Sequence, residues 1–177
     1  MSTRDEPPDA TLMADTRRRV FGLCRLLLVS ATEAEDATNG VFVRIQRAMA
    51  SYDRAIPFSQ WALAIARNHC LDLLRRRRVE ARIFTHEDEG ADTSRACPAP
   101  SPLGELLAGE EKARLREALF CLPERERVAL VLHYYEESDY EEIGRVLDLS
   151  RQGVATLVFR AKRALREQFE RVDKGAS

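Results

Sequence analysis

The sequence predicts an all-α protein made of two small helical domains joined by a flexible acidic linker. Apolar residues recur at spacings of three and four along most of the chain, which is the period of an amphipathic helix. No stretch alternates β-branched and polar residues between turn signals, as a half-buried strand would. The 177 residues suffice for one ordinary domain or two small ones, and the 45% of hydrophobic residues suffice for packed cores.

The composition and spacing exclude several classes of protein. No run approaches the ~20 consecutive apolar residues that span a bilayer, and residues 1–10 hold no apolar run typical of a secretory signal. We therefore expect a cytoplasmic protein without membrane insertion. The cysteines form no C-x-x-C pair, the histidines have no metal-ligand spacing, and no glycine-rich phosphate loop occurs. We predict no metal, no cofactor and no enzymatic activity.

The first domain, residues 9–84, is expected to contain three helices, at about 11–29, 32–50 and 58–78. In each of them the apolar residues fall on one face. Thr32 stands three residues before Glu35, a capping-box spacing that marks the start of the second helix. The segment 51–57 lacks the helical period and separates the second helix from the third.

The linker is predicted at residues 85–105. Residues 85–110 carry six acids and one basic residue, and the stretch 86–104 contains three prolines and two glycines. Such a segment buries too little apolar surface to offset the entropy lost on ordering. We therefore expect it to be flexible.

The second domain, residues 106–172, is expected to contain four helices, at about 106–122, 123–136, 140–147 and 150–171. Pro123 suits the first turn of the second of these helices. Ser138 and Glu141 have capping-box spacing before the third, and Ser150 is expected to cap the fourth.

The last two predicted helices are joined by a turn of about three residues, the spacing of a helix-turn-helix. Such a unit lays its second helix in the DNA major groove. Residues 150–171 carry six Lys and Arg against two acids, although the net charge of the chain is −1. Arg151 and Gln152 are suited to reading guanine and adenine, whereas the following basic residues would grip phosphates: Arg160, Lys162, Arg163 and Arg166. The alternative is a plain αα-hairpin with solvated charges.

Two parts of the sequence carry recurring motifs. The first part holds TEAEDATNGVFVRIQRAMASYD followed by PFSQWALAIARNHCLDLLRRRR, with an acidic start, an F-x-R run, F-x-x-W and I-A-R-N-x-x-x-D-x-x-R-R. The second part holds LREALFCLPERERVALVLHYYEESDYEEIGRVLDLS, with L-P-x-x-x-R-V. Together they resemble domains 2 and 4 of the extracytoplasmic-function (ECF) type of sigma factor in the sigma-70 family. The order of the two parts, the short linker and the total length make this combination specific.

The resemblance implies a transcription initiation subunit that binds core RNA polymerase and directs it to promoter DNA. Domain 2 would bind the β′ clamp coiled coil and recognise and melt the −10 element, and domain 4 would bind the β flap and the −35 element. The implied polymerase-binding residues are Glu35, Asp36, Asn39, Arg44 and Gln46. The implied −10 residues are Tyr52, Asp53, Trp61, Arg67, Asn68, Arg75, Arg76, Arg77 and Arg78. The implied −35 residues are Ser150, Arg151, Gln152, Ala155, Thr156, Arg160, Lys162 and Arg163.

The aromatic residues at the predicted −10 site have two interpretations. Tyr52, Phe58 and Trp61 would supply part of a pocket for a flipped base, because an unstacked base needs an aromatic wall. Alternatively, Phe58 and Trp61 pack inward, as large aromatic residues at helix starts usually do. The run 75–78 would contact the melted strand or form a solvated charged face.

The sequence departs from the family pattern in the predicted polymerase-binding helix. Where D-x-x-Q-E is usual, Asp36 begins the run D-A-T-N-G, so that Gly40 replaces an acid. This replacement predicts weak polymerase binding. Thr38 is a candidate phosphorylation site whose added charge would restore the contact, and the alternative is an ordinary helix threonine.

A second departure lies in the predicted recognition helix. Where a basic V-K-S-R-like run is expected, residues 154–157 read V-A-T-L, which predicts weaker phosphate binding and a shallower salt dependence. Leu157 and Phe159 then lie outside the apolar stripe. Thr156 and Leu157 would contact thymine methyl groups, or an anti-sigma factor or second subunit would cover the exposed Leu157 and Phe159.

Three functions remain open at this point. The first is a promoter-specifying sigma factor, and the second is a sigma-like mimic or decoy that binds a regulator without supporting transcription. The third is a free-standing helix-turn-helix regulator, which would bind duplex DNA alone. Promoter-specific transcripts made with core polymerase would distinguish the first function from the other two.

Overall fold

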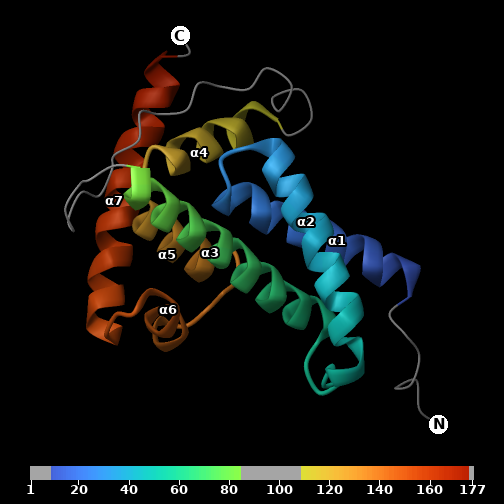
Figure 1. Cartoon of the computed structure of the whole chain (residues 1–177). Helices are drawn as coiled ribbons and strands as arrows, with labels where there is room; N and C mark the ends of the chain where they lie inside the picture. The colour runs from blue at the N-terminus through green and yellow to red at the C-terminus, as the bar shows by residue number, and fades with distance from the viewer. Residues whose placement is uncertain (1–8, 85–108, 176–177) are drawn as a thin grey trace. The chain divides into compact units, whose positions relative to one another are not determined.

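The computed structural model describes residues 9–84 and 109–175 (Figure 1). Within these two stretches the regular structure is entirely helical, which confirms the predicted all-α class. The chain divides after residue 87 into two compact units, called here the N-terminal unit and the C-terminal unit. The predicted linker, residues 85–105, lies outside the described residues. No helix in the described ranges is both long and apolar enough to cross a membrane.

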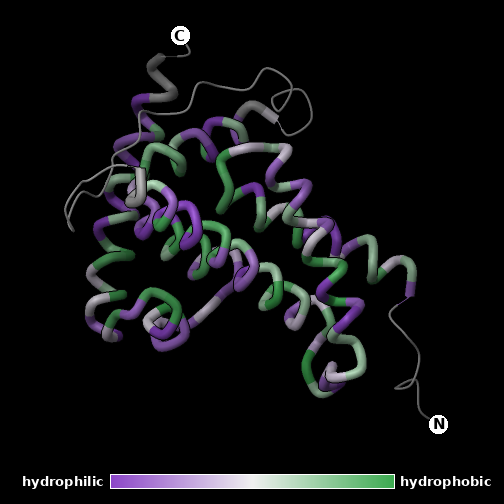
Figure 2. The backbone as a smooth tube through the Cα atoms, viewed as in Figure 1, coloured by the Kyte–Doolittle hydropathy of each residue, from purple (hydrophilic) through white to green (hydrophobic). Residues whose placement is uncertain are grey.

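In the described part of the N-terminal unit, residues 9–84, three helices pack against one another: α1 (Ala10–Leu27), α2 (Ala31–Ala48) and α3 (Phe58–Phe84). A short 3-10 turn, η1 (Met49–Ser51), follows α2. Each helix turns an apolar stripe inward, and Figure 2 shows hydrophobic and hydrophilic stretches alternating along the helices as their two faces. The fully or nearly fully buried side chains include Val20, Leu23, Leu27, Val41, Ile45, Ala62, Ala66 and Cys70.

The ends of these helices differ from the sequence prediction in two places. Ser30, and not Thr32, caps α2, because its hydroxyl accepts the Glu33 N–H at 3.5 Å while its own backbone is extended. Thr32 lies one residue inside the helix and is exposed. Helix α3 continues to Phe84, beyond the predicted end at 78, because no glycine or proline follows the arginine run to stop it.

Over residues 109–175, the C-terminal unit contains four helices: α4 (Glu110–Phe120), α5 (Glu124–Tyr134), α6 (Tyr140–Leu147) and α7 (Arg151–Gly175). The long helix α7 packs against all of the other three. Its inward stripe is formed by Val154, Val158 and Ala161, which are buried. This packing fixes which side of α7 is left for solvent or a partner.

The residues at two helix starts in this unit have roles shifted by one position from the prediction, although α6 begins at Tyr140 as predicted. Pro123 is the N-cap of α5 rather than its first helical residue, since its backbone is extended and its carbonyl accepts the Arg127 N–H at 2.9 Å. Ser138 does not cap α6. Asp139 and Glu142 form a reciprocal capping box instead. The Asp139 carboxylate accepts the Glu142 N–H at 2.8 Å, and the Glu142 carboxylate accepts the Asp139 N–H at 3.3 Å.

The turn between α6 and α7 has the geometry of a helix-turn-helix. Asp148 adopts a left-handed conformation with φ 54°, which ends α6 and reverses the chain. The Ser150 hydroxyl accepts the Gly153 N–H at 3.1 Å and so caps α7, as predicted. Gly144 permits this close turn, because a Cβ added there would lie 2.5 Å from the Leu149 carbonyl oxygen.

Replacing Gly144 by alanine is therefore expected to destabilise the C-terminal unit. The added methyl group meets backbone rather than a movable side chain, so the turn itself must shift, and overpacking of this kind costs about 1–3 kcal/mol. Urea unfolding of the full chain would measure the loss. Gly40→Ala is the control, because its added Cβ meets only the His69 ring, 3.1 Å from Nε2. Equal stability of Gly144→Ala and the parent would contradict this account of the turn.

Candidate functional site

The polar side of α2 presents all of the predicted polymerase-binding residues. Its inward side is buried, whereas the predicted set is exposed: Glu35, Asp36, Asn39, Arg44 and Gln46. The helical period places Glu35, Asn39 and Gln46 on one face and Arg44 away from them. Arg44 instead acts on His69 of α3, whose pKa it helps to lower. The structure therefore brings Glu35, Asn39 and Gln46 together on one face of α2 and places Arg44 on another.

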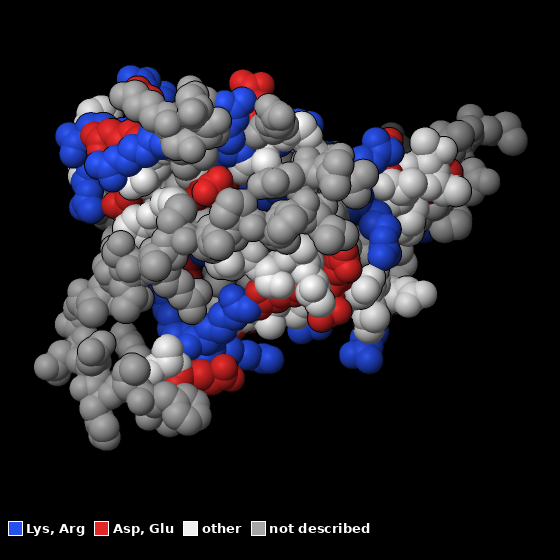
Figure 3. Space-filling view, turned by 90° about the horizontal axis from the view of Figure 1, so that it is seen from above, with Lys and Arg blue, Asp and Glu red and all other residues white. Residues whose placement is uncertain are grey.

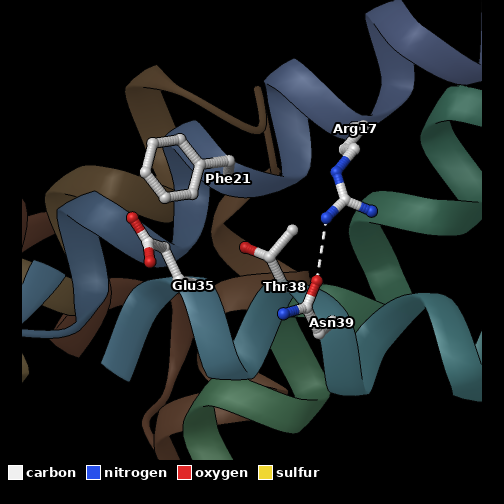
Figure 4. Close-up of a pocket in the computed structure, with 5 residues that line it drawn as sticks. All are labelled: Arg17, Phe21, Glu35, Thr38 and Asn39. Atoms are coloured by element: carbon white, nitrogen blue, oxygen red, sulfur yellow. Dashed lines mark hydrogen bonds between the residues drawn. The ribbon is translucent and has the colours of Figure 1, made fainter. Parts of the chain in front are cut away.

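A pocket of about 270 Å³ lies between α1 and α2 on this side (Figure 4). Its lining residues are Arg17, Phe21, Glu35, Thr38 and Asn39. The Arg17 Nη2 donates to Asn39 Oδ1 at 2.8 Å, and the guanidinium carbon lies 5.3 Å from the centre of the Phe42 ring. Arg17 and Phe21 were not singled out from the sequence, because nothing in the chain order shows that this part of α1 faces Asn39, 22 residues later.

Thr38 does not present the accessible hydroxyl that a phosphorylation site needs. Its side chain lines the pocket but the residue is only 3% exposed, and its Oγ1 donates to the Ala34 carbonyl at 2.6 Å. Helix threonines commonly make this i−4 bond. A kinase would reach Thr38 only after α2 opened locally, so the structure favours the ordinary helix threonine over the phosphorylation site.

Gly40, where the family pattern has an acid, lies close to α3. A Cβ at this position would be 3.1 Å from His69 Nε2, so the missing side chain makes room for the imidazole. Burial lowers the pKa of His69, with Arg44 and Arg76 adding to the decrease and Asp72 opposing it. Burial and the two arginines therefore favour the neutral imidazole of His69.

The predicted −10 aromatic residues form one cluster. The ring centres of Tyr52 and Trp61 are 4.7 Å apart, and Phe58 lies 5.7 Å from Tyr52 and 5.9 Å from Trp61. The Tyr52 hydroxyl donates to the Ile56 carbonyl at 2.6 Å, which holds the loop before α3 against the cluster. Phe58 is buried at 5% exposure, whereas Tyr52 and Trp61 are half-buried. The inward interpretation therefore holds for Phe58 alone.

The loop and the next turns of α3 carry the remaining −10 candidates. Asp53 is exposed, and its Oδ1 accepts the Ala55 N–H at 2.9 Å. The spacing of seven residues places Trp61, Asn68 and Arg75 on one face of α3. Asn68, Arg75, Arg76 and Arg78 are exposed and Arg67 is half-buried.

Several of these basic side chains are engaged by acids of their own unit. Arg75 pairs with Asp72 at 3.2 Å, and the half-buried Arg77 pairs with Glu33 of α2. Arg77 thus ties α3 to α2, which makes it a poorer candidate for DNA contact than its neighbours. On the face that Figure 3 shows, blue Lys and Arg atoms and red Asp and Glu atoms are interspersed.

The first turns of α7 expose the predicted base-reading residues. Gln152 is exposed, and its backbone carbonyl accepts the Thr156 hydroxyl at 3.0 Å. Arg151 is also exposed but forms an ion pair with Glu141 of α6 at 2.8 Å. Ser150 is occupied as a helix cap, and Ala155 is half-buried.

The later turns of α7 carry basic residues and one exposed ring. Arg160 pairs with Glu126 of α5 at 3.0 Å, Arg163 lies 3.9 Å from Glu167, and the Lys162 ammonium lies 6.0 Å from the centre of the Tyr134 ring. Phe159 is 70% exposed, as its place outside the apolar stripe predicts. Leu157 is half-buried, so the expectation that it is exposed was wrong.

Comparisons with known proteins find two regions of the chain that match the sigma-70 family. The Sigma-70 region 2 model matches residues 12–80, and the Sigma-70 region 4 model matches residues 112–165. The chain is 26% identical over 169 residues to the ECF RNA polymerase sigma factor SigW of Bacillus subtilis, covering 93% of this chain and 90% of that protein. It is 33% identical over 152 residues to the ECF RNA polymerase sigma factor SigE of Mycolicibacterium smegmatis, covering 84% of this chain and 56% of that protein.

A solved structure shares the fold. It is that of the sigma factor RpoE in complex with the anti-sigma factor NepR from Bartonella quintana, with a TM-score of 0.64 and 16% sequence identity, covering 90% of this chain and 95% of that one. The two matched regions occur in the predicted order, each within one compact unit. The chain belongs to the ECF group of the sigma-70 family.

Proposed function

We propose that this sigma factor, which directs promoter-specific transcription by core RNA polymerase, divides its contacts among three described surfaces. The polar side of α2 binds the polymerase, the Tyr52 loop with α3 binds the −10 element, and α7 binds the −35 element. The observation that carries the proposal is the exposure of Gln152 and Arg151 on a helix-turn-helix in a chain that also matches region 2. The chain supplies no catalysis in this role, acts in the cytoplasm and needs no cofactor.

Polymerase binding is assigned to the surface formed by Glu35, Asp36 and Asn39. Two exposed carboxylates on adjacent positions favour a basic partner, for which the family resemblance names the β′ clamp coiled coil. Arg17 adds a positive charge beside Asn39, so the surface is less acidic than the family pattern implies. The C-terminal unit is assigned to the β flap by the same resemblance.

The −10 element is assigned to the half-buried rings of Tyr52 and Trp61. A flipped base stacks on an aromatic face, and such stacking depends little on which base is present because every base has a π-face. Asn68 and Arg75 continue the same side of α3 and are placed to follow the melted strand. Asp53, Arg67, Arg76 and Arg78 border this path, and Arg77 has the weakest support because it is paired with Glu33.

The −35 element is assigned to the exposed side of α7. Arg151 and Gln152 in the first turn are suited to base edges, and Ala155 and Thr156 lie one turn later. Arg160, Lys162 and Arg163 are assigned to phosphates. We propose that an anti-sigma factor regulates this chain by competing for these surfaces. The solved structure of RpoE with a similar fold contains a protein of this kind.

The direct test is transcription. Purified chain is mixed with bacterial core RNA polymerase and a library of promoter fragments, and run-off transcripts are sequenced. Selective transcripts that require the chain support the proposal and give both promoter elements. Binding to core polymerase without any selective transcript would favour a sigma-like decoy, and duplex binding without core polymerase would favour a free-standing regulator.

Removal of the two acids on α2 is expected to weaken polymerase binding. The double substitution Glu35→Ala and Asp36→Ala should raise the Kd for core polymerase about tenfold, which corresponds to about 1.4 kcal/mol. Fluorescence anisotropy of the labelled chain would measure it. Glu80→Ala is the matched control, because Glu80 is also an exposed helical acid of the same unit. An unchanged Kd for the double variant would place the polymerase contact elsewhere.

Trp61 is the only tryptophan in the chain, so its fluorescence reports directly on the proposed −10 surface. We expect single-stranded oligonucleotides of the non-template −10 strand to quench this fluorescence when they bind, because a base stacks on the cluster. The same oligonucleotide with an abasic site at the flipped position is the control. Equal quenching by both oligonucleotides would argue against base stacking.

Alanine substitutions of Gln152 and of Lys162 are expected to have different kinds of effect on DNA binding. Gln152→Ala should relax the −35 preference at one base pair, by about 1–3 kcal/mol of discrimination. Lys162→Ala should weaken holoenzyme binding to all fragments alike and reduce the salt slope by about 1. Transcript sequencing and binding at several salt concentrations separate the two effects. Loss of discrimination in Lys162→Ala with none in Gln152→Ala would reverse the assignment.

A further inference from the structure

Glu126 of α5 is an acid in an unusual place. Its side chain is only 8% exposed, and its Oε1 accepts a hydrogen bond from Arg160 Nη2 at 3.0 Å. Arg160 itself belongs to α7 and has a side chain that is 61% exposed. One end of this ion pair is therefore fixed inside the C-terminal unit while the other end reaches its surface.

Burial makes this contact different from the other ion pairs of α7. Arg151 with Glu141 and Arg163 with Glu167 join side chains that are each more than half exposed, and such pairs contribute little and exchange readily with water. A buried carboxylate lacks that alternative, because it loses its hydration and depends on its cationic partner. Glu126 therefore holds the guanidinium of Arg160 more firmly than the exposed acids hold theirs.

A guanidinium held by one nitrogen still has donors to offer. Arginine carries five N–H donors in a planar fork, and the bond from Nη2 to Glu126 uses one of them. Because the Arg160 side chain is 61% exposed, its remaining donors are open to an anionic group such as a phosphate, two of whose oxygens they can bond at once. The carboxylate also offsets the charge of Arg160, which reduces attraction to phosphates that lie elsewhere.

We propose that Glu126 is a positioning residue for promoter recognition. From inside the C-terminal unit it holds Arg160 in place against one DNA backbone phosphate, and its carboxylate offsets part of the positive charge of Arg160. This inference rests on the proposed function of α7 and deepens it. Arg160 makes the DNA contact, and Glu126 acts only through it. The two effects, position and charge, are separable by substitution.

Two substitutions of Glu126 isolate the two effects. Glu126→Gln removes the charge but keeps an oxygen that accepts the Arg160 hydrogen bond, whereas Glu126→Ala removes both. Glu126→Gln should tighten holoenzyme binding to promoter and non-promoter fragments alike and steepen the slope of log K against log salt by up to about 0.9. Relative to Glu126→Gln, Glu126→Ala should lose about tenfold in the ratio of promoter to non-promoter binding.

Controls separate positioning from folding. Glu167→Gln is the matched control, because it removes an exposed acid from the neighbouring Arg163 and should leave binding ratio and slope unchanged. In an Arg160→Ala background, Glu126→Gln and Glu126→Ala should have equal binding ratios. Thermal unfolding of each chain identifies variants that do not fold. If Glu126→Ala does not fold, the double-mutant cycle of Glu126→Gln and Arg160→Ala is measured instead, with the salt slope of binding as its readout.

Each outcome decides the proposal. Equal promoter selectivity of folded Glu126→Gln and Glu126→Ala would overturn the claim that Glu126 positions Arg160. An unchanged salt slope in Glu126→Gln would overturn the claim that Glu126 offsets the charge of Arg160. These results are distinct from failure of the proposed function. In that case the parent holoenzyme itself would give no promoter-specific transcripts, whatever residue stands at position 126.

Discussion

The division of each helix into a buried apolar stripe and an exposed polar face is the constraint on which both units depend. On α7, Val154, Val158 and Ala161 are buried against the other helices of the unit, so Gln152 and Phe159 are left facing outward. The apolar side chains gain free energy from leaving water, at roughly 25 cal/mol per Å² of buried apolar area. The surface offered to a partner is thus set by packing on the opposite side of the same helix.

The exposed faces are further restricted by acids within each unit. Arg77 is held by Glu33 and Arg160 by Glu126, and in both pairs the acid is the less exposed partner. Each of these acids offsets part of the charge that its arginine would otherwise present to DNA phosphates. The number of arginines on a helix therefore overstates the charge that the helix can offer to nucleic acid.

Much of the fold follows from local sequence, whereas much of the site does not. Helical period and turn residues predict all the long helices, and the missed caps at Ser30 and Asp139 are near neighbours of the predicted Thr32 and Ser138. Cap choice is decided by which residue has an extended backbone, and several Ser, Thr and Asp residues compete for it. Arg17 with Asn39 and Glu126 with Arg160 are 22 and 34 residues apart, so only tertiary packing reveals them.

The same packing explains a departure that the sequence alone presents as a defect. An acid in place of Gly40 would put its Cβ against His69, whose pKa is already lowered by burial and by two arginines. Gly40 costs the helix about 1 kcal/mol relative to alanine, yet α2 runs unbroken through it to Ala48. The contact between α2 and α3 therefore compensates for the glycine. The absence of an acid at position 40 therefore affects packing inside the unit as much as it affects the outer surface.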